Sequence, residues 1–139
     1  MRLTFGVFVL AGAVAACGED PVDPGLLPNL VGRWEWIYAD GGISGIVITP
    51  ESEGMTLSLV VQEDGDLLLI QDGDMVIATT YELLPAQDLD DVSLPRIRYG
   101  GTILGVREHF IQFDIEGRLM LRPDCCDQFT YVWARPESL

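Results

Sequence analysis

Residues 55–82 read MTLSLVVQEDGDLLLIQDGDMVIATTYE, and this stretch decides the fold class. Every second residue from Met55 to Val61 is apolar, which is the period of a β-strand with one buried face. Asp64-Gly65-Asp66 and Asp72-Gly73-Asp74 follow at short intervals, and Asp-Gly pairs are strong signals for tight hairpin turns. The stretch therefore predicts consecutive antiparallel strands joined by hairpins.

The same pattern extends outward in both directions. Short strand-like segments alternate with clusters of Gly, Pro and Asp, and no long amphipathic helix fits anywhere. In the first segment Trp34, Trp36 and Tyr38 fall on one face. The predicted strands are Leu30–Tyr38, Ile46–Thr49, Met55–Gln62, Leu67–Gln71, Met75–Glu82, Arg96–Tyr99, Ile103–Arg107, His109–Asp114, Arg118–Arg122 and Phe129–Arg135.

Eight to ten short strands in one meander predict an all-β fold. Closing such a meander on itself removes the exposed sheet edges. We therefore expect a small antiparallel up-and-down β-barrel over residues 30–139.

The segment Leu83–Pro95 breaks the strand pattern. Its prolines and aspartates predict an exposed loop, with a short helix over Ala86–Val92 as an alternative. The run Leu67–Ile70 is apolar on both faces, so its outward side chains need a cover. Either the Leu83–Pro95 loop lies over them or they form a partner surface.

The first 16 residues predict export from the cytoplasm. Arg2 precedes an apolar run that is too short for a stable bilayer span, which is typical of a signal peptide. Val14-Ala15-Ala16-Cys17 resembles the lipobox of bacterial lipoproteins. This resemblance implies cleavage before Cys17, lipidation of that cysteine and anchoring in the cell envelope. Because Gly18 is not the aspartate that retains such proteins in the inner membrane, the outer membrane is favoured, on its periplasmic side.

Residues 17–29 predict a flexible spacer behind the lipid. The stretch GEDPVDPGLLPN at 18–29 holds three prolines, two glycines and three acids, a composition that favours an extended chain. The folded domain should begin near Leu30.

Charge excludes one large class of partners. After cleavage 22 acidic and seven basic residues remain, a net charge of about −15, and the chain contains no lysine. Nucleic-acid binding needs basic patches, so no nucleic-acid partner is expected. Contact with an anionic membrane is expected through the lipid anchor only.

With Cys17 lipidated, Cys125 and Cys126 remain as neighbours in Pro-Asp-Cys-Cys-Asp. Disulfide geometry is demanding, so adjacent cysteines form only a strained ring. Two thiols in a turn and a labile vicinal disulfide both stay open. A transition-metal site would need two further ligands, and His109 is the single histidine.

Four features in fixed order resemble a family. They are the opening Gly32-Arg33-Trp34-Glu35-Trp36, the Gly41-Gly42 loop, Thr49-Pro50-Glu51-Ser52, and Cys125-Cys126-Asp127 followed by Phe129-Thr130-Tyr131. Together they resemble short bacterial lipocalin-like domains, which are often lipoproteins. The resemblance implies that Gly32, Trp34 and Arg135 close one barrel end, with the guanidinium over the indole ring.

Other candidate chemistry has plainer explanations. The paired aspartates at 64/66 and 72/74 could hold calcium, but tight turns require the same residues. Glu108-His109 could supply a base, and Ser44, Ser52, Ser58 and Ser93 supply hydroxyls, yet no recognisable nucleophile motif surrounds them. We expect no enzyme activity, no metal and no cofactor.

The sequence thus leaves two hypotheses. The first is a lipid-anchored lipocalin-like barrel that binds a small apolar or amphipathic ligand inside; the inward candidates, chosen by alternation, are Trp36, Met55, Leu57, Leu59, Ile77 and Phe113. The second is an envelope interaction or inhibitor module without a cavity, whose loops at Gly41–Gly45 and Leu83–Pro95 contact a protein. A void of roughly 300 Å³ or more favours the first.

Overall fold

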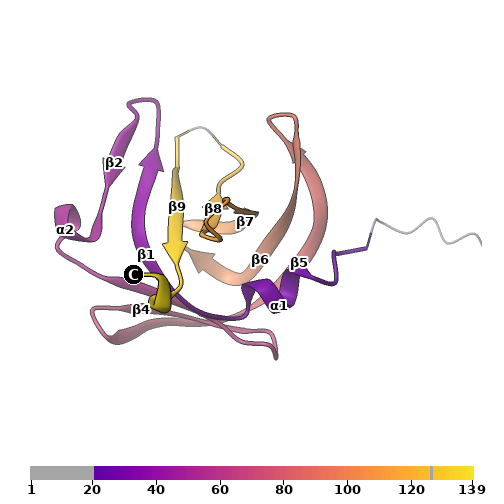
Figure 1. Ribbon diagram of the computed structural model, residues 1–139, viewed down its shortest axis with the longest axis horizontal. Coiled ribbons are helices and arrows are strands. Elements are labelled where there is room, and N and C mark those ends of the chain that lie inside the picture. The colour runs from indigo at the N-terminus through magenta and orange to yellow at the C-terminus, as the bar shows by residue number, and fades with distance from the viewer. Residues whose placement is uncertain (1–20, 126) are drawn as a thin grey trace, which may run out of the picture.

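The computed structural model describes residues 21–125 and 127–139, and Figure 1 shows strands curling around a common centre. The predicted signal peptide, Cys17 and Cys126 lie outside the described residues. The helical segments are α1 (Leu26–Leu30), α2 (Pro50–Glu53) and a 3-10 turn η1 (Pro136–Ser138). The strands are β1 (Gly32–Gly41), β2 (Ile46–Ile48), β3 (Leu57–Val61), β4 (Asp66–Gln71), β5 (Asp74–Leu89), β6 (Val92–Ile103), β7 (Val106–Phe113), β8 (Leu119–Arg122) and β9 (Phe129–Ala134).

The sheet closes into an antiparallel barrel. Neighbouring strands follow the order β1-β3-β4-β5-β6-β7-β8-β9, and β9 pairs back onto β1, with Trp36 opposite Trp133. β2 is an addition that pairs with the far end of β1. The predicted small antiparallel β-barrel is confirmed, with eight strands in the barrel itself.

Large side chains fill the barrel interior. The most deeply buried include Trp34, Trp133, Leu59, Leu67 and Ile111, each no more than 1% exposed. Both predicted hairpin signals are turns. The Gly65 nitrogen donates to the oxygen of Gln62, and Asp72 and Gly73 have the positive φ angles that a two-residue hairpin turn requires. The alternation around residues 55–82 therefore predicted these strands and their turns, but not the register shift between Leu69 and Ile70 where β4 pairs with β5.

One predicted face is wrong in β1. The register against β9 shifts between Trp36 and Tyr38, and this bulge reverses the alternation that follows. Ala39 is fully buried as a result, while Tyr38 is only half-buried. Trp34 and Trp36 face inward as predicted.

The segment Leu83–Pro95 is neither a loop nor a helix. Its residues continue β5 and begin β6, which form a long hairpin that turns at Asp90-Asp91. Both turn residues have positive φ, and a register shift between Leu84 and Gln87 accommodates Pro85. The predicted loop cover over the outward side chains of Leu67–Ile70 is therefore wrong, because residues 83–95 are strand and turn. The outward side chains Leu68 and Ile70 are half-buried.

A second boundary also differs from expectation. The predicted strand Ile103–Arg107 straddles the turn between β6 and β7, where Leu104 and Gly105 have positive φ. The predicted separate strand at Arg96–Tyr99 is part of β6. Two glycines before Ile103 obscured the continuity of this strand, because glycine weakens strand propensity.

The end of the predicted spacer is folded. Leu26–Leu30 forms α1 instead of an extended chain, and Leu26 and Leu30 belong to the core cluster. Their spacing of four residues places both side chains on one helix face. The domain therefore begins before Leu30.

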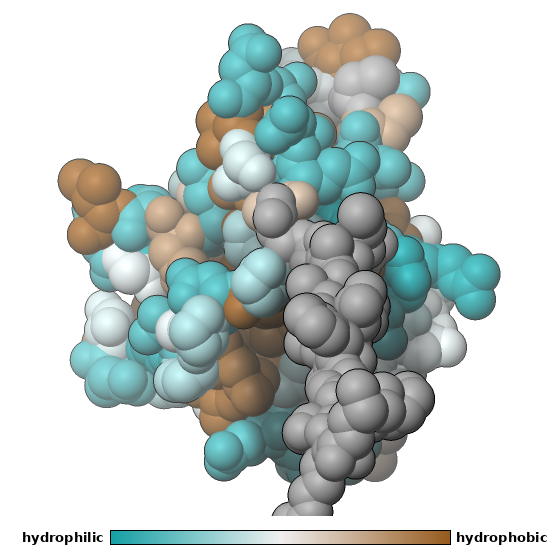
Figure 2. Space-filling model, turned by 90° about the vertical axis from the view of Figure 1, so that its right-hand side faces the viewer, coloured by the Kyte–Doolittle hydropathy of each residue, from teal (hydrophilic) through white to brown (hydrophobic). Residues whose placement is uncertain are grey.

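The surface is largely hydrophilic on the face drawn in Figure 2, where hydrophobic residues form separate patches. The most exposed large apolar side chains include Ile43 (90%) and Val47 (57%), next to and within β2. In the part of the chain that the structure describes, no helix is long and apolar enough to cross a bilayer.

Candidate functional site

The six predicted ligand residues all belong to the barrel core. Trp36, Leu57 and Leu59 are buried in it, and the other three pack against it while half-buried; these are Met55, Ile77 and Phe113. The alternation therefore placed all six on the inner face. Among the pockets described below, only Phe113 of the six lines one.

A buried polar pair lies among these apolar residues. His109 in β7 is 1% exposed, and its Nδ1 lies 2.7 Å from the hydroxyl of Tyr99 in β6. Burial lowers the pKa of His109 to about 4, so the ring is neutral at pH 7. Burial also raises the pKa of Tyr99, which keeps its hydroxyl protonated.

This pair fixes the histidine tautomer. The Tyr99 hydroxyl has no other acceptor among the described residues, so it donates to Nδ1 of His109. The ring proton then sits on Nε2. No described residue accepts a hydrogen bond from that nitrogen.

Two indole groups are also unpaired inside the barrel. The Nε1 atoms of Trp36 and Trp133 are buried, and no described residue accepts a hydrogen bond from either. The two residues lie opposite each other on β1 and β9. Leaving a buried donor without an acceptor costs about 1–3 kcal/mol, so the arrangement calls for an explanation.

Tyr131 connects these indoles to a small pocket at one barrel end. Its ring centroid lies 6.0 Å from that of Trp36 and 6.4 Å from that of Trp133. The pocket has a volume of about 160 Å³ and opens to solvent. We call this site the barrel mouth; its lining residues are Leu104, Gly105, Val106, His109, Asp127, Gln128, Phe129 and Tyr131.

The opposite end, beside α1, holds the predicted arginine–tryptophan contact. The Cζ atom of Arg135 lies 3.8 Å from the ring centroid of Trp34. Its guanidinium donates hydrogen bonds to the backbone oxygens of Val31 (2.9 Å) and Asn29 (2.8 Å). A Cβ atom at Gly32 would lie 2.3 Å from Arg135 Nη1, so this contact requires glycine there.

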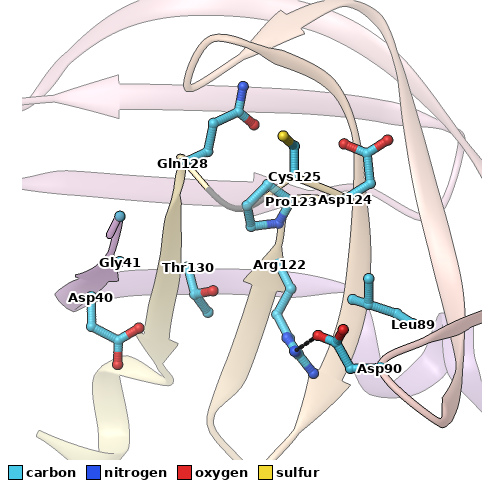
Figure 3. Close-up of a pocket in the computed structure, with 11 residues that line it drawn as sticks. Asp40, Gly41, Leu89, Asp90, Arg122, Pro123, Asp124, Cys125, Gln128 and Thr130 are labelled. Atoms are coloured by element: carbon cyan, nitrogen blue, oxygen red, sulfur yellow. Dashed lines mark hydrogen bonds and ion pairs between the residues drawn. The ribbon is translucent and has the colours of Figure 1, made fainter. Parts of the chain in front are cut away.

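A polar pocket of about 390 Å³ lies between the ends of β1, β8 and β9 and the tip of the β5–β6 hairpin (Figure 3). Arg122 in this pocket pairs with Asp90 at 3.5 Å, and Cys125 is exposed at its edge. Arg122 and Thr130 alternate with the interior residues Leu121 and Tyr131, so they face outward. The hairpin tip therefore folds over the outside of the barrel.

The other residues that the sequence offered for metal binding or catalysis either form turns or lie apart from one another. Asp64 and Asp72 accept hydrogen bonds from the backbone nitrogens of Asp66 and Thr56, as turn residues do. Within residues 21–125 and 127–139 no group of three His, Cys, Asp or Glu side chains could hold a metal ion. Glu108 forms ion pairs with two arginines on the outer face, away from the buried His109.

Sequence reasoning missed Tyr99, Tyr131 and Trp133 as members of the site. Their strands were predicted, and their alternation with outward residues was available. The unpaired indoles, however, depend on where each ring nitrogen ends in three dimensions, which alternation does not give.

Comparison with known proteins adds no relative to this picture. No family model matches the chain, and neither a curated protein nor a solved structure matches it.

Proposed function

We propose that this domain is a binding protein for a small amphipathic molecule that carries hydrogen-bond acceptors, held in and below the barrel mouth. The observation that carries the proposal is the pair of buried indole N–H groups of Trp36 and Trp133 without an acceptor. A ligand that brings acceptor oxygens to them would satisfy donors whose burial is otherwise costly.

Three donors lie beside Tyr131 or line the mouth with it, and none of them has an acceptor among the described residues. Besides the two indoles, the neutral ring of His109 offers its Nε2–H at the wall of the mouth. Donors that have no acceptor select ligands by their acceptor oxygens, and because Asp127 also lines the mouth, neutral carbonyl or ether oxygens are favoured over a carboxylate. Aromatic faces from Phe129 and Tyr131 supply the apolar part of the recognition, with their ring centroids 6.5 Å apart.

The size of the mouth limits the ligand. Its volume of about 160 Å³ equals roughly five water molecules at about 30 Å³ each. Beyond the two indoles, toward α1, the paired residues Trp34 and Leu59 are each 1% exposed, so the ligand reaches no deeper than Trp36 and Trp133. We therefore expect a small polar-aromatic or short-chain molecule rather than a long lipid tail.

The place of action follows from the sequence prediction at the N-terminus. A lipid on Cys17 would tether the barrel to the envelope, with the outer membrane favoured, and the acidic surface would keep it off anionic bilayers. This part of the proposal is testable on its own. Metabolic labelling with a palmitate analogue should mark the wild-type chain and not the Cys17→Ser variant.

Native mass spectrometry tests the binding function. The Cys17→Ser chain, exported with its own signal and purified gently, should carry a bound small molecule of defined mass. Trp36→Phe and Trp133→Phe each remove one donor and keep an aromatic ring, so both should lose most of the bound species. Arg107→Gln is the control, because Arg107 is exposed and lines neither the mouth nor the pocket beside α1. Equal occupancy in all four proteins, or none in any, would overturn the proposal.

A second function rests on a different observation. Three apolar side chains are exposed around the short edge strand β2: Ile43 (90%), Ile46 (53%) and Val47 (57%). A barrel whose core is packed is also compatible with a protein-interaction module that binds no small molecule. In that case β2 would add a partner's strand to its free edge. Co-purification of one envelope protein that is lost in Val47→Asp, with no bound small molecule, would favour this alternative.

A further inference from the structure

We propose that a second, independent binding site lies beside α1, and that it takes an oxyanion attached to an apolar body. The site is a pocket of about 400 Å³ that opens to solvent between α1, the end of β7 and the residue after β9. Its lining residues are Pro28, Asn29, Trp34, Phe113, Gly117 and Arg135. It lies at the opposite end of the barrel from the mouth and does not depend on ligand binding there.

Arg135, the cation in this pocket, forms no ion pair with a described carboxylate. Five of the seven arginines that the structure describes form ion pairs with carboxylates at 4 Å or less. Arg135 forms none, and both of its described hydrogen bonds go to backbone oxygens. Glu137 acts on it only through space, and partial burial lowers the pKa of Arg135. In a chain of net charge −14, an unpaired guanidinium held in a pocket is an exception.

The geometry leaves the guanidinium able to bind. Two of its five N–H donors are used by the oxygens of Val31 and Asn29, and its face lies on Trp34. The remaining donors are available to an oxyanion, and a fixed, planar guanidinium loses little entropy when it binds one.

Apart from Asn29, the side chains that line the rest of the pocket are apolar. The rings of Trp34 and Phe113 lie 6.1 Å apart, and Pro28 faces them from α1. An inorganic anion would leave these surfaces in contact with water. A carboxylate, sulfonate or phosphate monoester joined to a chain or ring would use the guanidinium and the apolar wall together. The ligand class is therefore an amphipathic anion.

Calorimetric titration with decyl phosphate tests this site, with decanol and inorganic phosphate as comparisons. At 0.15 M salt the Debye length is about 8 Å, so distant carboxylates are largely screened. We expect decyl phosphate to bind at least tenfold more tightly than either comparison. The indole N–H resonance of Trp34, which is hydrogen-bonded to Leu30, should shift on binding.

Two variants keep the test decisive. Asn29→Trp blocks the pocket from its exposed rim and retains the backbone oxygen that Arg135 uses, so it should weaken decyl phosphate at least tenfold without unfolding the barrel. Arg107→Gln removes an exposed arginine outside the pocket and should change nothing. Equal binding of decanol and decyl phosphate would overturn the anion assignment. Shifts confined to the indoles of Trp36 and Trp133, or unchanged binding to Asn29→Trp, would overturn the location.

Discussion

Replacing Trp34 and Trp36 by phenylalanine, one at a time, compares the same chemical change at two buried positions of one strand. Trp34 is 1% exposed and its indole N–H donates to the oxygen of Leu30 at 2.8 Å. Trp36 is 3% exposed and its indole N–H has no acceptor among the described residues. Both changes lose similar ring area, so the difference between them reports the state of the indole N–H.

The magnitude follows from these contacts. Trp34→Phe loses a buried hydrogen bond worth about 1 kcal/mol and weakens the stacking of Arg135, worth about 0.5–1 kcal/mol. Trp36→Phe instead removes a donor whose burial costs about 1–3 kcal/mol. We expect Trp34→Phe to lower the free energy of unfolding by at least about 2 kcal/mol more than Trp36→Phe does.

Urea denaturation followed by far-ultraviolet circular dichroism measures this difference without relying on tryptophan emission. With a slope of about 1–3 kcal/mol per molar urea, the two midpoints should lie roughly 1 M apart, and Trp34→Phe should unfold first. Refolding from urea beforehand removes any bound ligand. Equal midpoints would refute the reasoning, because they would mean that the N–H of Trp36 is satisfied in the free protein.

Three further predictions concern other parts of the barrel. Between pH 6.5 and about 4 His109 is protonated in the unfolded chain but not in the folded chain. The free energy of unfolding should therefore fall by about 3 kcal/mol as the pH drops through this window. The NMR titration of the single histidine should have its midpoint near 4, and a midpoint near 6.5 would contradict this. Gly32→Ala should cost at least about 2 kcal/mol in thermal denaturation, since the backbone is strained for alanine and the Cβ meets Arg135; a cost below about 0.5 kcal/mol would contradict it. Asp90→Asn combined with Asp91→Gly suits a turn with two positive φ angles and should stabilise by about 0.5–1 kcal/mol; a lower melting temperature would exclude that turn.

The barrel was predictable because its strands repeat one local pattern. Alternation from Met55 onward, with Asp-Gly turns, defined β3, β4 and the start of β5 almost to the residue. The closure of the sheet into a barrel was also predictable, because an antiparallel meander with no helices to cover it has exposed edge strands unless it closes on itself. The contact of Arg135 with Trp34 was predicted from the family resemblance and is present.

The errors have specific physical causes. The tip of the β5–β6 hairpin around Asp90 lies over the outside of the barrel, where its side chains need not alternate between core and solvent, so its sequence resembled a loop. Because of the bulge after Trp36, Ala39 and not Tyr38 lies on the inner face, and no residue in the sequence predicts such a register shift. The helix α1 was missed because only the spacing of Leu26 and Leu30 favours a helix there, while the prolines in and around it favour an extended chain.

The site was harder to predict than the fold. Alternation put Trp36 and Phe113 on the inner face, but it could not separate residues that fill the core from residues that line a pocket. That distinction depends on side-chain packing. The unpaired indoles and the donor state of His109 come from hydrogen-bond geometry across β1, β6, β7 and β9.

The indole ¹H–¹⁵N NMR spectrum tests the central claim, that the barrel holds an acceptor-bearing ligand at Trp36 and Trp133, most directly. The protein as isolated from the envelope is compared with the same protein after unfolding, dialysis and refolding. We predict that the resonances of Trp36 and Trp133 move downfield in the isolated form, as hydrogen-bonded N–H groups do, while that of Trp34 stays in place. Superimposable spectra of the two preparations would contradict the account.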